Sequence, residues 1–338
     1  VVSYKNGGNS NYGTARVFTV SGTSISFGTA VVFNSGSTDK TRSVFDSVNN
    51  KIVIGFSDDA DSSKGKAVVG TISGTDITFG SEVQFEQGQL DSHGAAAFDS
   101  DQGKVVFAYR QNASSGGSTD FKRGTAVVGT VSGDTISFGT PVAFDNTGDY
   151  GENSGANAAV YDSNAKKVLV VYPRTVDGSY SNRGHVFALK VTGDTVVTDT
   201  PNNFNGAATA GYPSISFDTN VNKNLIAFNH DSNEYASVVS YSPVARNLNS
   251  ENFLGFMSGQ ASFRSLAAAT GSETVFEEAA VKMVSATYDS NSEKVVIAYK
   301  DEGNSNQGTA IVGTVSGTSI SFGSPTVIES GIQYNNKQ

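Results

Sequence analysis

The chain has 338 residues, and 23 Lys and Arg against 32 Asp and Glu give it a net charge of −9. An acidic chain repels the phosphate backbone that supplies most nucleic-acid affinity, so a nucleic-acid partner is disfavoured. The absence of Cys excludes disulfides, thiolate metal sites and cysteine nucleophiles. No apolar run approaches the roughly 18 residues that span a bilayer, so we expect no membrane insertion. The 37 Gly and 6 Pro predict a folded, turn-rich β protein.

One apolar segment recurs six times along the chain. Its copies are VVSY (Val1–Tyr4), KIVIGF (Lys51–Phe56), KVVFAY (Lys104–Tyr109), KVLVVY (Lys167–Tyr172), KNLIAF (Lys223–Phe228) and KVVIAY (Lys294–Tyr299). They define repeats 1 to 6, over residues 1–42, 43–94, 95–157, 158–213, 214–284 and 285–331. A repeat period of this length is typical of solenoids, propellers and arrays.

Each repeat predicts four antiparallel strands. The first ends in an aromatic residue and Asp, as in Phe98-Asp99. The second is the apolar segment, whose continuous hydrophobicity suits a strand buried on both faces. The third resembles GTAVVGTV, and the fourth resembles TSISFGTPVVF, in which Ile136 and Phe138 alternate with polar residues and are expected to point inward. Short links rich in Ser, Gly, Asn and Asp predict tight turns.

Such repeats favour a closed ring, and we expect a six-bladed β-propeller formed by the whole chain as one domain. Val1 begins repeat 1 without a first strand, whereas residues 332–338 resemble one. We therefore expect Ile332 to Asn335 to supply the first strand of the N-terminal blade and to close the ring. A β-solenoid is the structural alternative. The polar start at Val1, without Met, also indicates a piece of a longer chain.

Repeats 4 and 5 depart from the pattern. Repeat 4 has Val196-Val197-Thr198-Asp199 in place of the Ile-Ser-Phe-Gly segment, and repeat 5 carries a long insertion. Two stretches near that insertion, Ala267–Ala269 and Glu277–Ala280, have a composition that favours a short helix.

Length variation is confined to one predicted end of the strands, where the second strand leads to the third and the fourth leads to the next repeat. Variable loops on a rigid scaffold commonly carry recognition. Aromatic, amide and charged side chains gather there and suit sugar rings and their hydroxyls, although turn formation alone explains much of this composition. The candidate ligand-binding residues are Asp120, Phe121, Tyr150, Asn153, Asp177, Tyr180, Arg183 and Tyr212.

Metal sites are weakly supported. The repeated Asp of the first strand, as in Asp46 or Asp99, fits a turn that its own side chain caps better than a ring of metal ligands. The acidic loop Asp58–Asp61 lacks EF-hand spacing, so we interpret it as a solvated loop in which calcium is the one conceivable ion. His93, His185 and His230 are not spaced as a zinc pair. We expect no metal site and no cofactor.

Catalysis is the alternative to binding. A glycosidase needs two carboxylates across a cleft, for which the loops offer Asp120, Asp149, Glu152 and Asp177. Arg110, Arg123, Arg174 and Arg183 cluster in repeats 3 and 4, as carboxylate-binding arginines do in propeller sialidases, but this is an analogy of fold alone. The motifs of serine hydrolases, zinc proteases and phosphate-binding loops are absent, so we assign no catalytic residue.

The repeat YDSNSEKVVIAYKDEGNSNQGTAIVGTVSGTSISFGSP (Tyr288–Pro325) resembles repeats in tail-fibre and other surface proteins of marine bacteriophages, notably cyanophages. Repeats 1, 2, 3 and 6 carry this resemblance, whereas repeats 4 and 5 depart from it. The resemblance implies a virion-surface or extracellular location, within a larger multimeric chain or fibre, and a role in host recognition.

These observations together predict a non-enzymatic receptor-binding or adhesion module that recognises host-surface glycans through its long loops. A polysaccharide-degrading propeller enzyme is the first alternative, and a structural spacer or decoration domain is the second.

Overall fold

The computed structural model describes residues 1–21, 24–90, 94–113, 121–145, 158–176, 179–205, 211–229, 236–243, 269–270, 273–289, 293–316 and 319–329. Over this part of the chain the regular structure is β strand, apart from one 3-10 turn, η1, at Asp59–Asp61. None of the described segments forms a helix that is long and apolar enough to cross a bilayer. The all-β fold class predicted from the sequence is therefore confirmed.

The strands follow the repeats in chain order. Repeat 1 contains β1 (Val2–Asn6), β2 (Tyr12–Arg16), β3 (Phe18–Ser21) and β4 (Ser24–Phe27), and β5 (Val31–Asp46) continues into repeat 2. Repeat 2 adds β6 (Lys51–Asp58), β7 (Lys64–Ser73), β8 (Asp76–Phe79) and β9 (Val83–Gln89). Repeat 3 contains β10 (Ala95–Asp99), β11 (Lys104–Ala113), β12 (Phe121–Ser132), β13 (Thr135–Phe138) and β14 (Val142–Asp145).

Repeats 4 to 6 have the same order of strands. Repeat 4 contains β15 (Ala158–Asp162), β16 (Lys167–Val176), β17 (Ser179–Thr192), β18 (Thr195–Thr198) and β19 (Asn202–Asn203). Repeat 5 contains β20 (Gly211–Asp218), β21 (Lys223–Asn229), β22 (Ala236–Ser242), β23 (Ala269–Thr270) and β24 (Thr274–Glu277). The last strands are β25 (Val281–Asp289), β26 (Lys294–Asp301), β27 (Gln307–Ser316), β28 (Ser319–Phe322) and β29 (Thr326–Glu329).

Pairing within the repeats is antiparallel between neighbours, as in the order β10-β11-β12-β13. The predicted fourth strand differs from expectation, because it is split into two segments, β13 and β14, that both pair with β12. The split follows Gly139, whose N–H bonds the Val128 carbonyl. A Cβ at Gly139 would lie 1.8 Å from the carbonyl oxygen of Asp194 in repeat 4, so this close approach of two backbones requires glycine.

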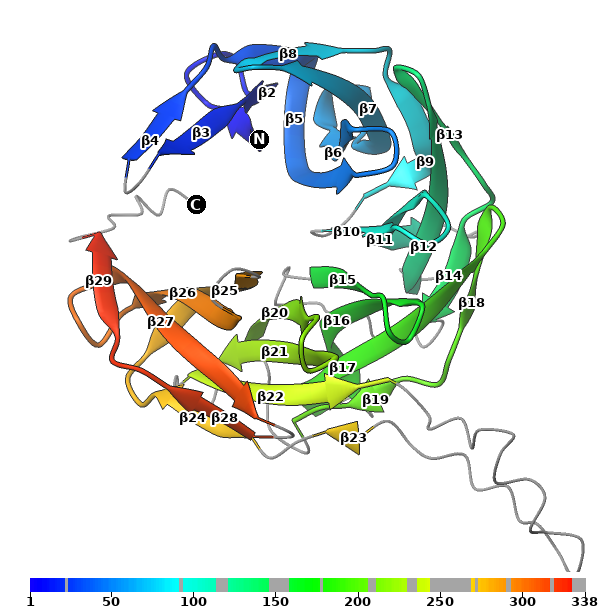
Figure 1. Cartoon of the computed structure of the whole chain (residues 1–338). Helices are drawn as coiled ribbons and strands as arrows, with labels where there is room; N and C mark the ends of the chain where they lie inside the picture. Colours follow the sequence, from blue (N-terminus) through cyan, green and yellow to red (C-terminus); the bar gives the residue numbers. More distant parts are fainter. Residues whose placement is uncertain are drawn as a thin grey trace, which may run out of the picture.

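The sheets follow one another around a common centre in chain order (Figure 1). Their first strands lie innermost, and β10 contacts β15, β15 contacts β20, and β20 contacts β25. The arrangement is propeller-like, built from several antiparallel sheets. Among the described strands, β1 is an edge strand that pairs with β2. The segment Ile332 to Asn335, expected to pair beside it, lies outside the described residues.

Hydrophobic clusters join each sheet to the next, from repeats 1 and 2 to repeats 5 and 6. In the second strand of repeat 2, Val53 packs toward repeat 3 and Ile54 toward repeat 1, and both are fully buried. The prediction that this strand is buried on both faces is thus confirmed for repeat 2. Burial of both faces is the main source of cohesion between sheets, because apolar area removed from water stabilises the fold.

The expectation of a helix near Glu277–Ala280 is wrong. Glu277 ends strand β24, and the Glu277 Oε1 atom accepts a hydrogen bond from the Ala279 N–H at 3.0 Å, which holds the following chain in a turn. In the other stretch, Ala269 belongs to β23, whereas Ala267 and Ala268 lie outside the described residues. Pairing of β24 with β22 therefore prevails over a composition that favours helix.

Candidate functional site

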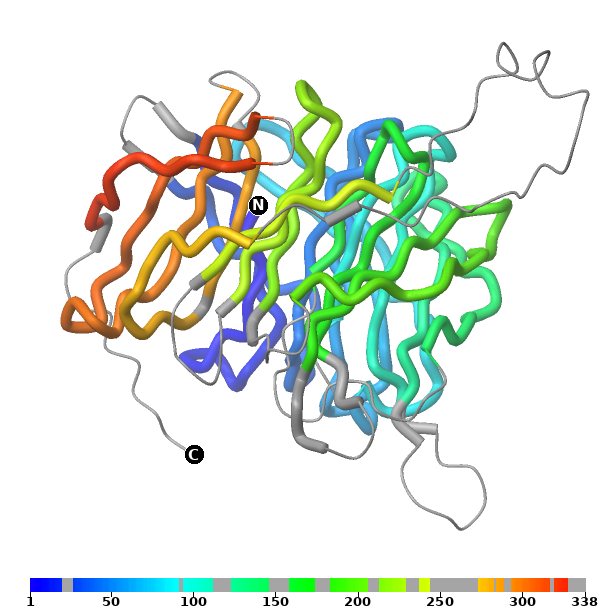
Figure 2. The backbone as a smooth tube through the Cα atoms, turned by 90° about the horizontal axis from the view of Figure 1, so that it is seen from below, coloured from blue at the N-terminus to red at the C-terminus, as the bar shows by residue number. Residues whose placement is uncertain are grey.

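The sheets have two chemically different ends. We call the end with the links between first and second strands the turn end, and the end with the links between second and third strands the loop end. In Figure 2 the strands of successive sheets run between these two ends. The links that follow β11 and β16 lie at the loop end, as the alternation of the strands predicts. The long loop expected over Pro173–Gly184 is instead mostly strand, because β16 runs to Val176 and β17 begins at Ser179.

At the turn end the repeated Asp residues cap their own turns. The Asp99 Oδ1 atom accepts hydrogen bonds from the N–H groups of Asp101 and Gln102, both at 3.0 Å. The same pair of bonds occurs at Asp46, Asp162 and Asp218. All four side chains are buried. The structural interpretation of this Asp is confirmed in these four repeats, because a carboxylate that satisfies two amides beside its own strand is fixed as a turn cap.

A second device at the turn end joins neighbouring sheets. The Lys104 ammonium of repeat 3 bonds Thr130 Oγ1 at 2.6 Å and reaches Asp194 Oδ1 of repeat 4 at 2.8 Å. Lys51, Thr71 and Asp134 repeat this arrangement between repeats 2 and 3. The bond from Lys104 is the main reason that the pKa of Asp194 lies below its usual value. The turn end is therefore a set of repeated structural contacts.

The predicted ligand residues lie at the loop end but fall largely outside what the structure describes. Phe121 lies in β12, Tyr180 in β17 and Tyr212 in β20, but their side chains are not described. The others outside the described residues are Asp120, Tyr150, Asn153 and Asp177, and so are the glycosidase candidates Asp149 and Glu152. Arg183 is the predicted residue whose side chain can be placed.

Arg183 has an equivalent in the preceding repeat. Arg123 in β12 and Arg183 in β17 each stand one residue before the glycine at the loop end of the third strand. Arg123 lies opposite Gln111 of β11, and Arg183 lies opposite Arg174 of β16. Both Nε atoms are buried and have no hydrogen-bond partner within the described structure. A buried donor without a partner costs about 1–3 kcal/mol, so two of them at equivalent positions mark this end as a place for an acceptor.

Buried tyrosine–carboxylate pairs also lie at the loop end, between consecutive sheets. The Tyr109 hydroxyl donates to Glu86 Oε2 at 2.9 Å, and the Tyr172 hydroxyl donates to Asp145 Oδ2 at 2.7 Å. Glu86 and Asp145 are 4% and 3% exposed. The sequence analysis missed these pairs. The signal was available, because each acid follows an aromatic residue at the end of a fourth strand, and each Tyr ends a second strand.

These pairs hold the tyrosines in their neutral form. Burial, followed by the charge of Glu86 and its hydrogen bond, raises the pKa of Tyr109 well above its ordinary value. Burial and Glu277 likewise raise the pKa of Tyr299. A protonated phenol donates to a carboxylate and does not act as a base. The described carboxylates of these pairs are therefore structural, since each already accepts from a tyrosine across the interface.

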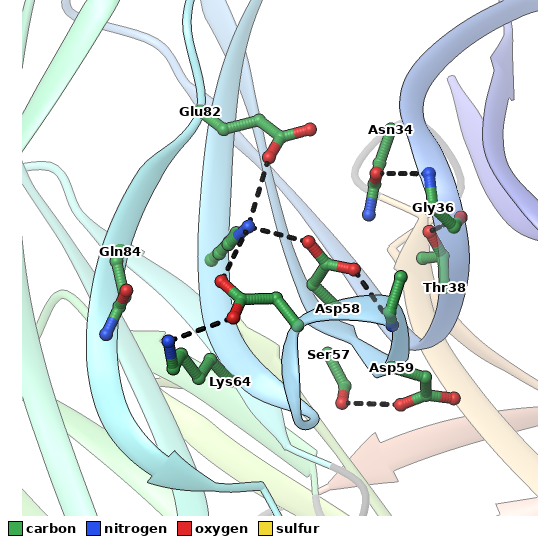
Figure 3. A network of polar contacts seen from close by, with 12 residues as sticks. Asn34, Gly36, Thr38, Ser57, Asp58, Asp59, Lys64, Glu82 and Gln84 are labelled. Atoms are coloured by element: carbon green, nitrogen blue, oxygen red, sulfur yellow. Dashed lines mark hydrogen bonds and ion pairs between the residues drawn. The ribbon is translucent and has the colours of Figure 1, made fainter.

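The acidic loop at Asp58–Asp61 is closed by lysines (Figure 3). The Lys66 ammonium lies 2.6 Å from Asp58 Oδ2 and 3.2 Å from Asp61 Oδ2, and the Lys64 ammonium lies 2.9 Å from Asp61 Oδ1. Burial alone lowers the pKa of Lys66, but these carboxylates outweigh it and raise that pKa. The ammonium groups stand where calcium would need to bind, so this loop does not fit calcium.

The histidines form no metal pair within the described structure. His185 is buried in β17, and its Nδ1 lies 3.0 Å from the Arg183 carbonyl oxygen. His93 and His230 lie outside the described residues. No cluster of three or more potential metal ligands occurs in the described part of the chain.

No protein-family model matches the chain, and no curated protein matches it. Among solved structures it is similar to AofleA from Arthrobotrys oligospora, with a TM-score of 0.53 and 9% identity over 97% of this chain and 86% of that one. It also aligns with RS223-Beta-xylosidase, with a TM-score of 0.41 and 9% identity over 84% of this chain and 94% of that one. At 9% identity, the similarity to AofleA is evidence about the fold alone.

Proposed function

We propose that the chain is a non-enzymatic glycan-binding module of the receptor-binding or adhesion type, with its ligand site at the loop end of repeats 3 and 4. The observation that carries the proposal is the equivalent placement of Arg123 and Arg183, whose buried Nε donors have no partner within the described structure. At the turn end the described charged groups differ from these arginines, because its four Asp side chains and its lysines are bonded within the fold. The buried atoms without a partner at that end, on Tyr161, Asn224 and Tyr288, belong to neutral groups.

The chemistry of these arginines favours a ligand rich in oxygen acceptors. A guanidinium presents planar donors that suit carboxylates and paired hydroxyls, and it stays charged at any working pH. The nearby carboxylates Glu86 and Asp145 already accept from tyrosines, so the arginines are the charged open donors of the described loop end, beside the neutral Nδ2 of Asn34. A glycan that carries carboxylate or sulfate groups fits this better than a neutral one.

The proposed module is a six-bladed ring. Six copies of the second strand and the propeller-like order of the sheets support this count. In this ring Ile332 to Asn335 add the first strand of repeat 1, beside the edge strand β1. A closed ring would hold the loop ends of all repeats in one rigid array.

We propose a virion-surface location, within a multimeric fibre, on the resemblance of the repeats alone. Several weak sites on one fibre would reinforce one another by avidity. Antibodies raised against the purified chain would label intact phage particles from the same source if this location is right, and would label none if it is wrong.

The test of function separates binding from hydrolysis. The purified chain is incubated with a glycan array and with cell envelopes, and both retained protein and released reducing sugar are assayed. Retention on acidic glycans without sugar release supports the proposal. Sugar release would overturn the non-enzymatic assignment, and neither retention nor release would leave a spacer or decoration role.

A further inference from the structure

The loop-end contacts between consecutive sheets obey a pairing rule. Where the apolar segment of the second strand ends in Tyr, the residue after the final Phe or Ile of the preceding repeat's fourth strand is a carboxylate. Where the segment ends in Phe, that residue is Asn. The carboxylate pairs are Tyr109 with Glu86, Tyr172 with Asp145, and Tyr299 with Glu277, with O–O distances of 2.9, 2.7 and 3.3 Å. At the equivalent positions of the other two interfaces, Phe56 corresponds to Asn34 and Phe228 to Asn205, and the preceding rings, Phe33 and Phe204, contact these phenylalanines.

The rule has a physical reason. A carboxylate has two oxygens to satisfy, and in Glu86 one accepts from the Tyr109 hydroxyl while the other accepts from the Gly88 N–H at 2.7 Å. Asn34 keeps the second contact, since its Oδ1 atom accepts from the Gly36 N–H at 2.7 Å, while its uncharged Nδ2 has no partner within the described structure. A Phe beside a buried carboxylate would remove a donor from a charged oxygen, which is costly. At Glu86 the Gln111 side chain also donates to that oxygen, at 3.0 Å.

Repeats 1 and 6 each expose a face that other repeats bury. Val312 of β27 is 44% exposed, whereas Val69 and Val128 at the same position in repeats 2 and 3 are 0% and 1% exposed. On β1, Val2 is 39% exposed, whereas the equivalent Ile54 is fully buried. Both faces are therefore built as sheet interfaces.

The strand register places Tyr4 and Glu329 at the positions that the Tyr and the carboxylate occupy in the other interfaces. Tyr4 lies opposite Thr14, as Tyr109 lies opposite Thr125. Glu329 ends β29 and lies opposite Gly308, as Glu86 lies opposite Gly65. We propose that the exposed faces of repeats 6 and 1 of one chain pack against each other, and that Tyr4 and Glu329 form the sixth tyrosine–carboxylate pair. This inference rests on the proposed six-bladed ring and assigns the residues that lock it.

Several observations identify the occupant of each face as the other face of the same chain. Tyr4 has no carboxylate partner within the described structure, and Glu329 occupies the carboxylate position of the other open face at the equivalent register. The contact would continue the interfaces already formed by repeats 1 to 6. If a second copy of the chain supplied these partners instead, Tyr4 of one copy would pair with Glu329 of the other, and the protein would be a dimer.

A double-mutant cycle tests the pair through the urea midpoint of unfolding. Tyr4→Phe leaves Glu329 without its donor and should lower the folding equilibrium constant roughly tenfold. Adding Glu329→Asn recreates the Phe–Asn pair found at Phe56 and should recover most of that loss. The matched control is Tyr109→Phe with and without Glu86→Asn, at an interface that is already formed.

Each other outcome overturns the proposal. Additive, near-neutral effects at Tyr4 and Glu329, beside clear coupling at Tyr109 and Glu86, would mean that the two faces do not meet. Coupling that depends on protein concentration, with a dimer in light scattering, would identify a second copy as the occupant. Deleting residues 332–338 separates this inference from the proposal that those residues add a strand to repeat 1. If Tyr4 and Glu329 stay coupled after the deletion, the added strand is refuted and the pair stands. If the deletion lowers stability but Tyr4 and Glu329 show no coupling, the pair is refuted.

Discussion

The two ends of the sheets differ in how their charged side chains are used, although both ends bury some neutral polar atoms without a partner within the described structure. At the turn end, four buried Asp side chains each satisfy two backbone amides, and lysines tie one sheet to the next. At the loop end, Arg123 and Arg183 keep buried donors without partners within the described structure. The contrast teaches that related repeats can bond their charged groups at one end and leave charged donors without partners at the other. Four predictions test whether this division is real.

The largest expected loss comes from Asp162→Ala at the turn end. Asp162 is fully buried, accepts from the N–H groups of Asn164 and Ala165, and accepts from the Asn224 side chain at 2.7 Å. Removing it leaves these donors unpaired and should cost about 3 kcal/mol. Urea unfolding measures the loss, with Asp76→Ala as the exposed control. A loss below about 1 kcal/mol would contradict the role of these turns.

Alkaline pH should lower the stability of the fold through Tyr241, which lies at the turn end. Burial is the main cause that raises the pKa of Tyr241 to about 12, and Asn202 partly opposes it. The unfolded pKa is about 10. Because the folded pKa is the higher one, this contribution to stability is complete below about pH 10 and is lost as the pH rises toward 12.

Ultraviolet absorbance of tyrosinate follows this titration without interference, because the chain contains no Trp. Tyr241→Phe should remove one late-titrating group while leaving the earlier titration unchanged. A variant with an unchanged late phase would show that Tyr241 titrates normally.

A smaller effect is expected from Lys104→Met, which breaks the contact between repeats 3 and 4. Asp194 is largely exposed, so the pair is screened by solvent and contributes little. The melting temperature should fall by less than about 2 °C, and the difference from wild type should shrink in high salt. The matched control is Lys5→Met, because Lys5 is exposed. Lys40 is unsuitable as a control because its ammonium donates to the Leu90 carbonyl at 2.5 Å.

The smallest stability change is expected at the loop end, from Arg183→Ala. Its Nε has no partner within the described structure, so the substitution should not lower stability by more than about 0.5 kcal/mol. Retention on acidic glycans should nevertheless fall at least tenfold. Urea unfolding and the glycan array measure the two effects on the same preparation, and a large stability loss would assign Arg183 to the scaffold.

The sequence predicted the scaffold better than the site, for physical reasons. Apolar second strands and Asp turns depend on local patterns, and both appear as expected in Val105–Tyr109 and Asp99. The break of the fourth strand at Gly139 depends on contact with the backbone of the next sheet, which no local pattern contains. The Tyr109–Glu86 pair also joins residues of different repeats, so it becomes visible only when the repeats are aligned as neighbours.

The central claim is that the loop end of repeats 3 and 4 binds a glycan while the turn end is structural. The most direct test compares the glycan-array retention of three proteins. These are the wild type, a double variant with Arg123→Ala and Arg183→Ala, and a double variant with Asp134→Ala and Asp194→Ala. We predict that the arginine variant loses retention with unchanged unfolding, whereas the aspartate variant keeps it. Equal retention by all three proteins, or loss confined to the aspartate variant, would contradict the account.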